Sequence, residues 1–272
     1  LKAAFEAAVF SNAMVVKTQP DNADWHAGDI RYNVLRWTSS PNPPFGGYGP
    51  SFVNPRTGQI IGADIMLEWV YFTNRVKYDE LFSMADSPLM CSAGELIQQG
   101  NVFASAAIDI HAGTVEQKKE LINESLVRLT LHEVGHTLGL NHNFKSSRLH
   151  NLNDIHDKKL TSKVGLTGSV MEYPSINVAL DPENQGEYYT TVPGPYDLWA
   201  IEFGYSLELD NPEKMNALLN RSTEPELTFA NDADDMRAPG KGIDPHAMIY
   251  DLTSDAVGYS VERMKLVIRL QN

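Results

Sequence analysis

Residues 132–142 read His-Glu-Val-Gly-His-Thr-Leu-Gly-Leu-Asn-His. On a helix, His132 and His136 lie one turn apart and point the same way, so both imidazoles can reach one metal ion. Gly139 is suited to end that helix, because glycine enters a left-handed C-terminal turn without strain. The turn would bring His142 to the same ion from another direction. Three neutral nitrogens predict a tetrahedral zinc site with one position left for water.

Glu133 directly follows the first histidine, so its carboxylate can approach that water. It is suited to accept the water's proton and later to deliver it to a leaving amine. Zinc would lower the pKa of the water to about 7 and polarise a carbonyl. Two structural histidines on a buried helix are the alternative, but they do not explain a glycine and a third histidine at these offsets. The sequence therefore predicts the parts needed to hydrolyse an amide.

The histidine motif lies near the end of a long predicted helix. Thr114 and, three residues later, Gln117 form a capping-box pattern at its start, and the apolar pattern continues to Leu138. Residues 41–50 are dense in proline and glycine and are expected to be loop. Further helices are expected at residues 1–10, 195–203 and 212–219, strands at 30–37, 59–68 and 102–110, and a partly helical segment at 69–99. These elements indicate a mixed α/β fold.

Composition excludes several classes of protein. The 272 residues carry 22 lysines and arginines against 35 aspartates and glutamates, a net charge of −13. An acidic surface repels phosphate backbones, so nucleic acid is not an expected partner. No stretch approaches the roughly 20 apolar residues of a membrane helix. The chain begins inside a helical pattern without a secretion signal, so we expect a fragment of a longer protein whose upstream segments are further partners.

The histidine spacing resembles the metzincin signature, His-Glu-x-x-His-x-x-Gly-x-x-His. Metzincins also carry a methionine in a tight turn beneath the zinc, and residues 168–174, Gly-Ser-Val-Met-Glu-Tyr-Pro, resemble this Met-turn. The resemblance implies that Met171 forms an apolar floor under the histidines. It also implies that Tyr173 helps to stabilise the oxyanion, as in astacin-like and serralysin-like enzymes. A core tyrosine that packs on the turn is the alternative.

The wider chain is similar to the Met-zincin catalytic domains of large exported bacterial proteins. The segments that carry the similarity are residues 29–33, 47–50, 55–58, 141–144 and 194–205. The resemblance implies a single catalytic domain, with a twisted mixed sheet and the active-site helix in an upper lobe (1–142). An irregular, mainly helical lower lobe (143–272) would follow, with the cleft between the lobes. It also implies one catalytic Zn²⁺, a peptide or protein substrate and an extracytoplasmic location: secreted, periplasmic or in the cell envelope.

Other residues leave alternatives open. In metzincins an edge strand above the metal pairs with the substrate backbone, and Ile61, Gly62 and Ala63 could form it or belong to an interior strand. His150 and His156 are expected to be solvated loop histidines. The aspartates near the C-terminus favour turns and helix caps over calcium binding; they are Asp232, Asp234, Asp235, Asp244, Asp251 and Asp255.

Two other functions compete with an endopeptidase. One is a zinc hydrolase acting on a non-peptide amide, which would favour a closed pocket over an extended cleft. The other is a catalytically silent binding module that keeps the fold. The intact Glu133 argues against the silent module, because such a module has no need of the general base.

Overall fold

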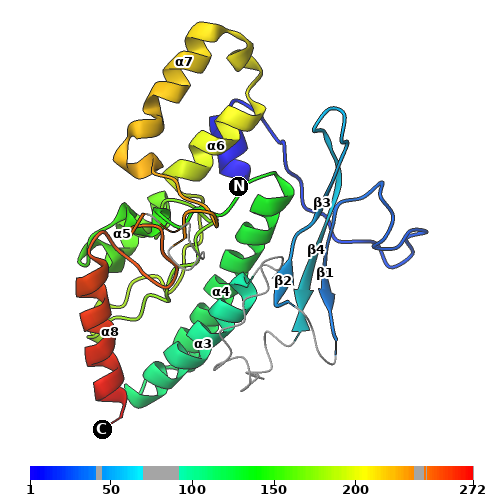
Figure 1. The fold of residues 1–272 in the computed structure, drawn as a ribbon. Helices are drawn as coiled ribbons and strands as arrows, with labels where there is room; N and C mark the ends of the chain where they lie inside the picture. Colours follow the sequence, from blue (N-terminus) through cyan, green and yellow to red (C-terminus); the bar gives the residue numbers. More distant parts are fainter. Residues whose placement is uncertain (41–44, 70–91, 236–241, 243, 272) are drawn as a thin grey trace.

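A computed structural model describes residues 1–40, 45–69, 92–235, 242 and 244–271. It shows a mixed α/β fold, as the sequence predicts. A small sheet lies on one side of two long helices, α3 and α4, and the later helices gather on the other side (Figure 1). The expected division into an upper and a lower lobe within a single domain stays a prediction.

The sheet is built around one long strand. β4 (Ile60–Glu68) pairs in parallel with β1 (Val34–Thr38) along one edge. Along the other edge it pairs antiparallel with β2 (Gly47–Tyr48) and β3 (Ser51–Val53). Ile65 and Leu67, two residues apart on β4, are buried, because alternate side chains of a strand share a face. The strand expected at 59–68 is confirmed, and the one expected at 30–37 starts later, at β1.

β3 pairs with Gly62 and Ala63 along one edge of β4. Along the other edge the ladder with β1 begins only at Asp64, and the Ala63 N–H donates to Asn33 Oδ1 at 2.9 Å. The substrate-binding role of Ile61, Gly62 and Ala63 stays a prediction. One expectation for this region is wrong: residues 41–50 are not loop throughout, since β2 lies within them.

Of the predictions for the two long helices, one is confirmed and one is wrong. α4 (Val115–Thr137) starts with the expected capping box, in which the Thr114 N–H donates to Gln117 Oε1 at 2.7 Å and the Gln117 N–H donates to Thr114 Oγ1 at 3.2 Å. The strand expected at 102–110 is wrong, because these residues form the second half of α3 (Ala93–Ile110). Residues 70–91 of the partly helical segment expected at 69–99 lie outside the described residues.

Helices expected at residues 1–10, 195–203 and 212–219 are confirmed. The other α-helices among the described residues are α1 (Lys2–Ala7), α5 (Lys158–Val164), α6 (Pro195–Tyr205), α7 (Pro212–Asn220) and α8 (Ala256–Leu270). Short 3-10 helices occur at Ser146–Leu149, Asp154–His156, Pro182–Asn184, Leu207–Asp210, Arg221–Thr223 and Pro225–Leu227. α1 packs on α6, where Phe5 meets Ile201 and Tyr205.

The main core positions the segments that follow α4. Leu129 on α4 is fully buried among Ile65 and Leu67 of the sheet and Phe144 and Tyr173 from beyond the helix. Burial of large apolar side chains is the main stabilising force in such a core. It therefore holds residues 142–144 and 171–173 beside the same helix.

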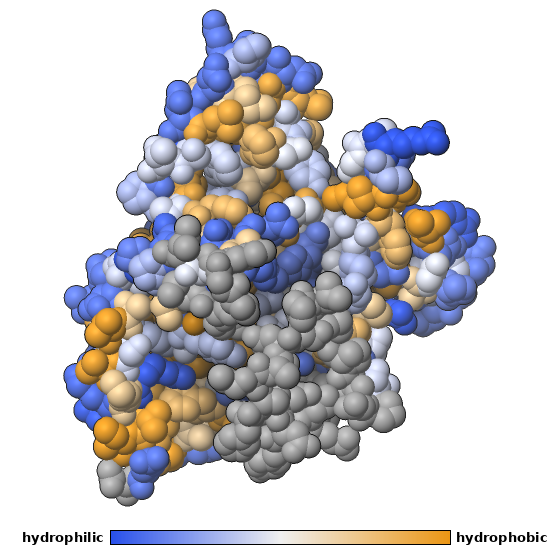
Figure 2. Space-filling model, in the orientation of Figure 1, coloured by the Kyte–Doolittle hydropathy of each residue, from blue (hydrophilic) through white to orange (hydrophobic). Residues whose placement is uncertain are grey.

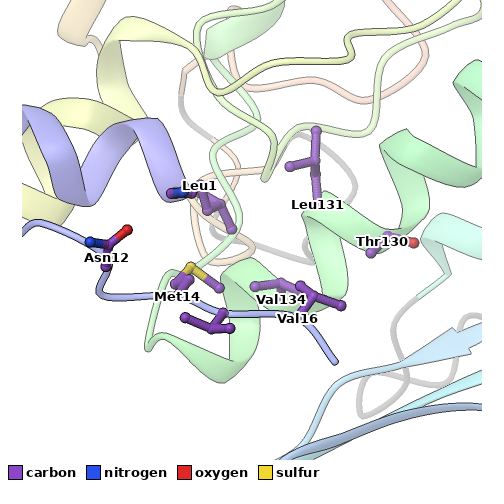
Figure 3. A pocket seen from close by; sticks show the side chains of 9 residues that line it. Leu1, Asn12, Met14, Val16, Thr130, Leu131 and Val134 are labelled. Carbon is purple, nitrogen blue, oxygen red and sulfur yellow. The ribbon is translucent and has the colours of Figure 1, made fainter. Parts of the chain in front are cut away.

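The surface carries two apolar features. Along α8, exposed apolar side chains recur at helical spacing; they are Val257, Val261, Met264 and Ile268. Figure 2 shows separate orange patches on the lower left of the molecule, the side on which α8 lies in Figure 1. A pocket opens between the start of the chain and α4 (Figure 3), lined by Leu1, Lys2, Asn12, Met14, Val15, Val16, Thr130, Leu131 and Val134. None of the predicted site residues lines this pocket. Among the described helices, none is long and apolar enough to cross a membrane.

Candidate metal centre

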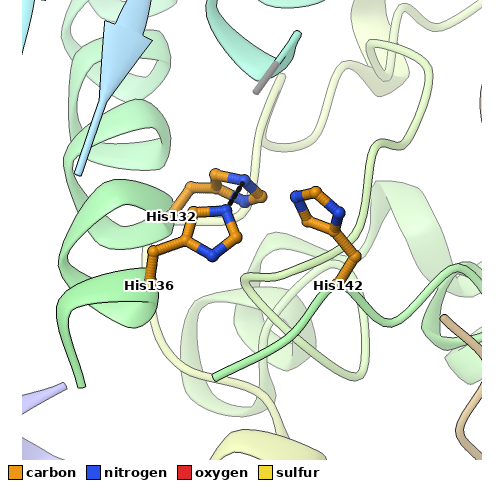
Figure 4. A group of neighbouring side chains, drawn as sticks. All are labelled: His132, His136 and His142. Carbon is orange, nitrogen blue, oxygen red and sulfur yellow. Dashed lines mark hydrogen bonds between the residues drawn. The ribbon is translucent and has the colours of Figure 1, made fainter. Parts of the chain in front are cut away.

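The three histidines of the motif converge on one point. His132 and His136 project from neighbouring turns of α4, and His142 faces them from the segment that follows the helix (Figure 4). One ring nitrogen from each residue lies within 4.8 Å of the others. Gly139, with a φ of +86°, makes the turn that returns the chain, as the sequence predicts. Among the described residues, these three side chains form the one cluster able to hold a metal ion.

Hydrogen bonds fix which nitrogen of the two helical histidines faces the centre. His132 Nδ1 lies 2.8 Å from the Val170 carbonyl, and His136 Nδ1 lies 3.2 Å from the Leu140 carbonyl. A carbonyl only accepts, so each Nδ1 carries the proton and donates it. Burial, reinforced by the neighbouring histidines, lowers the pKa of His132 well below its ordinary value and that of His136 to about 4. Both rings are therefore neutral near pH 7, with bare Nε2 atoms.

A cation fits between these nitrogens. The Nε2 atoms of His132 and His136 are 3.1 Å apart. Two lone pairs at this separation repel each other unless a positive charge lies between them. Neutral imidazole nitrogens are favoured ligands of zinc, so the donor set satisfies the requirement for a three-histidine zinc site.

The third histidine is held by two side chains. The Nδ1 atom of His142 lies 2.9 Å from both carboxylate oxygens of Asp232. On the other side of the ring, the Tyr173 hydroxyl lies 3.0 Å from His142 Nε2. Tyr173 is buried and packs on Phe144. Its position beside the ligand nitrogen suits the oxyanion role, and its packing suits the core role.

Glu133 lies beneath the short strand β2. Its side chain is fully buried, and a Cβ added to Gly47 would lie 2.7 Å from Glu133 Oε1. A Cβ on Gly49 would collide with the Glu133 backbone carbonyl. The strand can approach the helix this closely only because both residues are glycine. Sequence reasoning missed this role, although the glycines at 47 and 49 stand in a segment that resembles the family.

Met171 lies directly under the histidine helix. It is fully buried, and its sulfur occupies the place where a Cβ on Gly135 would lie. Gly135 stands between the two helical ligands, so the methionine packs against the turn that carries them. Met171 and Tyr173 thus lie beside the histidines, and Glu133 adjoins His132 on α4, whereas residues 61–63 belong to strand β4.

Two buried charged residues hold the turn that contains Met171. Arg128, one helical turn before His132, donates from Nη1 to the Val170 carbonyl at 2.6 Å and from Nη2 to the Glu172 carbonyl. From α6, Asp197 accepts hydrogen bonds from Ser169 Oγ at 2.6 Å and from the backbone N–H groups of Val170 and Gly194, each at 2.8 Å. Burial raises the pKa of Asp197 to about 6. Sequence reasoning missed both residues, because their partners are distant in the chain.

The residues set aside in the sequence include three aspartates in the expected role and two residues in other roles. Asp244, Asp234 and Asp255 cap turns or a helix, as expected: the N–H groups of His246, Asn231 and Gly258 donate to them. Asp232 instead contacts His142. His150 is buried, with Nε2 2.8 Å from the Gly165 carbonyl, so the expectation of a solvated loop is wrong for it.

Comparison with known proteins agrees with this geometry. A family model described as Met-zincin matches residues 114–272. Searches of curated proteins and of solved structures gave no match. The matched segment starts at the cap of α4 and contains the three histidines, Glu133, Met171 and Tyr173. Because the match covers more than half of the chain, the chain belongs to the Met-zincin family of metzincin-type zinc metallopeptidase domains.

Proposed function

We propose that this chain is a zinc-dependent endopeptidase that hydrolyses internal peptide bonds of peptide or protein substrates. The observation that carries the proposal is the convergence of three imidazole rings on one point, with Glu133 next to His132 on α4. His132, His136 and His142 would hold a single Zn²⁺ through their Nε2 atoms. When bound, zinc supplies a Lewis acid that polarises a carbonyl and makes water a better nucleophile at neutral pH.

Glu133 is the general base in this proposal. It neighbours His132 in the chain, and its carboxylate is fully buried under Gly47. The carboxylate takes one proton from the attacking water as the new C–O bond forms at the scissile carbonyl. It then gives that proton to the leaving nitrogen as the C–N bond breaks, so Glu133 ends the cycle ionised.

Tyr173 is the candidate oxyanion donor. Its hydroxyl lies 3.0 Å from the His142 nitrogen that faces the metal, which brings the O–H near an oxygen that develops negative charge at the centre. A hydrogen bond that strengthens in the transition state lowers the barrier more than it strengthens substrate binding. The proposal therefore assigns Tyr173 to catalysis and Met171 to support of the ligands.

The setting of the activity is part of the same proposal. The resemblance to catalytic domains of large exported bacterial proteins supports an extracytoplasmic location, with upstream segments of the same polypeptide as partners. The net charge of −13 supports a function without nucleic acid.

Cleavage of a diverse peptide library by the zinc-loaded chain tests the proposal. The matched variants are Glu133→Ala and Glu116→Ala, the latter an exposed glutamate in the first turn of the same helix. We expect internal cuts from the parent and from Glu116→Ala, and none from Glu133→Ala. A folded, zinc-bound parent that cuts no peptide would contradict the proposal and favour the non-peptide amide hydrolase or the silent binding module.

A further inference from the structure

The three histidines differ in what their outer nitrogens contact. The Nδ1 atoms of His132 and His136 face backbone carbonyls, whereas Nδ1 of His142 faces the carboxylate of Asp232, 2.9 Å from each oxygen. A carboxylate accepts a stronger, charge-assisted hydrogen bond than a carbonyl does. Of the three histidines, His142 therefore has the strongest hydrogen-bond acceptor at Nδ1.

Asp232 reaches His142 from 90 residues further along the chain because its segment is fastened beside the ligand. The Phe144 N–H donates to the Ala230 carbonyl at 2.7 Å. The buried Asn143 donates from its side chain to the Thr228 carbonyl at 3.0 Å and accepts from the Ala230 N–H at 3.2 Å. Residues 228–230 thus bond to the two residues that follow His142, and the turn that carries Asp232 comes directly after them.

His142 also has the greatest need of such a partner. The other two ligands project from a regular helix, which restricts their side-chain directions. His142 stands after the helix has ended, and its side chain keeps 14% of its surface exposed. Without a fixed acceptor at Nδ1, its ring could turn and its proton could move to the nitrogen that must bind the metal.

We propose that Asp232 is a positioning residue for the metal centre, which it serves by holding His142 in the Nδ1–H tautomer with Nε2 directed at the zinc. The inference rests on the proposed function only in taking zinc as the bound ion. The charge-assisted hydrogen bond from Nδ1 also makes the imidazole a stronger metal ligand. Because 67% of the Asp232 side chain is exposed, water and salt screen its charge. Its contribution to zinc affinity should therefore lie at the lower end of the range for carboxylates that hydrogen-bond to metal-binding histidines.

A purely structural role for Asp232 is the rival explanation. In that case the carboxylate would only tie the 228–235 segment to the rest of the chain. A substitution would then change the stability of the metal-free protein and leave its intrinsic affinity for zinc unchanged. The two explanations differ in metal binding, which is measurable without any substrate.

The test compares the full chain with Asp232→Asn, Asp232→Ala and Asp244→Asn. Asn keeps an acceptor oxygen without the charge, and Ala removes both. Asp244 is the control, because it also ties a later segment of the chain to the stretch that follows His142, by accepting a hydrogen bond from Lys145 Nζ at 2.7 Å and not from a histidine ring nitrogen of the cluster. Zinc affinity is measured by competition with a chromophoric chelator, ligand geometry by the visible spectrum of the Co²⁺ form, and folding by thermal melting of the metal-free protein.

We expect Asp232→Ala to weaken zinc binding by about tenfold, the lower end of the ~10- to 100-fold range for such partners. Asp232→Asn should lose less, with an altered Co²⁺ spectrum and a metal-free melting temperature equal to that of the parent. Asp244→Asn should bind zinc as the parent does. Zinc affinity within twofold of the parent in both Asp232 variants, or an equal loss in Asp244→Asn, would overturn the inference.

Together with the peptide-library cleavage described above, these measurements separate this inference from the proposed function. If Asp232→Ala weakens zinc binding while the parent cuts no peptide, the positioning role stands and the endopeptidase proposal falls. If the parent cuts peptides and the Asp232 variants bind zinc normally, the positioning role falls alone. A parent that binds no zinc contradicts both.

Discussion

The sulfur of Met171 lies against the Cα of Gly135, in the space that any side chain at position 135 would need. Gly135 directly precedes the second histidine ligand, and Met171 is fully buried. The close approach therefore couples the floor of the metal centre to the helical turn that carries His132 and His136. It gives a packing reason for a glycine inside the last turn of α4, since glycine is otherwise unfavourable within a helix.

Gly135→Ala should destabilise the protein. The new methyl group would overlap the sulfur of the fully buried Met171, and overpacking of this kind costs about 1–3 kcal/mol. Gly204→Ala is the matched control, because Gly204 also lies in a helix and a Cβ there would meet nothing within 4 Å. Urea unfolding should show a loss for Gly135→Ala and no loss for Gly204→Ala. Equal stability of the two variants would show that Met171 moves aside freely.

Arg128→Met should be destabilising as well, by roughly 2–4 kcal/mol, because it leaves two buried carbonyls without a charged donor. Arg128 is 1% exposed and bonds the carbonyls of Val170 and Glu172 on either side of Met171. Arg221→Met removes only an exposed ion pair with Glu224 and should change stability by less than about 0.5 kcal/mol. Denaturant unfolding at pH 7 compares the two. A similar, small change in both would contradict the role assigned to Arg128.

Local sequence patterns were sufficient to predict the ligand helix. The capping box at Thr114, the helical spacing of His132 and His136, and the left-handed turn at Gly139 all depend on neighbours within a few residues. Recognition of Met171 needed the family resemblance, because nothing local distinguishes this methionine from other core residues.

The features that sequence reasoning missed depend on distant contacts. Asp232 meets a histidine 90 residues earlier, and Arg128 meets carbonyls 42 and 44 residues later. Local sequence patterns carry no information about contacts between residues so far apart in the chain. Residues 102–110 were predicted as a strand because their apolar residues suit either element. In the structure these residues are helical, and Ala104 and Ile108, four residues apart, are buried on the same face of α3.

Glu124 should make stability depend on pH in a defined direction. Burial raises its pKa to about 7, although it accepts hydrogen bonds from the N–H groups of Tyr188 and Tyr189. The folded state therefore binds a proton more tightly than the unfolded state between about pH 4.5 and 7. Through this group, stability rises as pH falls across that window and is lowest above it.

Glu124→Gln removes that titration and keeps an acceptor oxygen. The variant should be more stable than the parent by roughly 1–3 kcal/mol at pH 8, a difference that should vanish near pH 4.5. Glu116→Gln, at an exposed position of the same helix, should follow the parent at every pH. Urea unfolding from pH 4.5 to 8 provides the measurement. A pH-independent difference between Glu124→Gln and the parent would refute the assignment.

Gly47→Ala should reduce turnover much more than it reduces zinc binding. The added methyl group would lie 2.7 Å from Glu133 Oε1 and 2.9 Å from Leu129 Cδ1, and its three nearest atoms belong to these two side chains and to none of the histidines. A displacement of a general base by about 1 Å can lower kcat by roughly a hundredfold. Steady-state cleavage of a peptide identified in the library should show this loss in kcat, with chelator competition showing zinc affinity close to that of the parent. If zinc affinity falls as far as kcat, β2 supports the whole centre and not the base alone; if neither changes, the close contact between Gly47 and Glu133 has no part in catalysis.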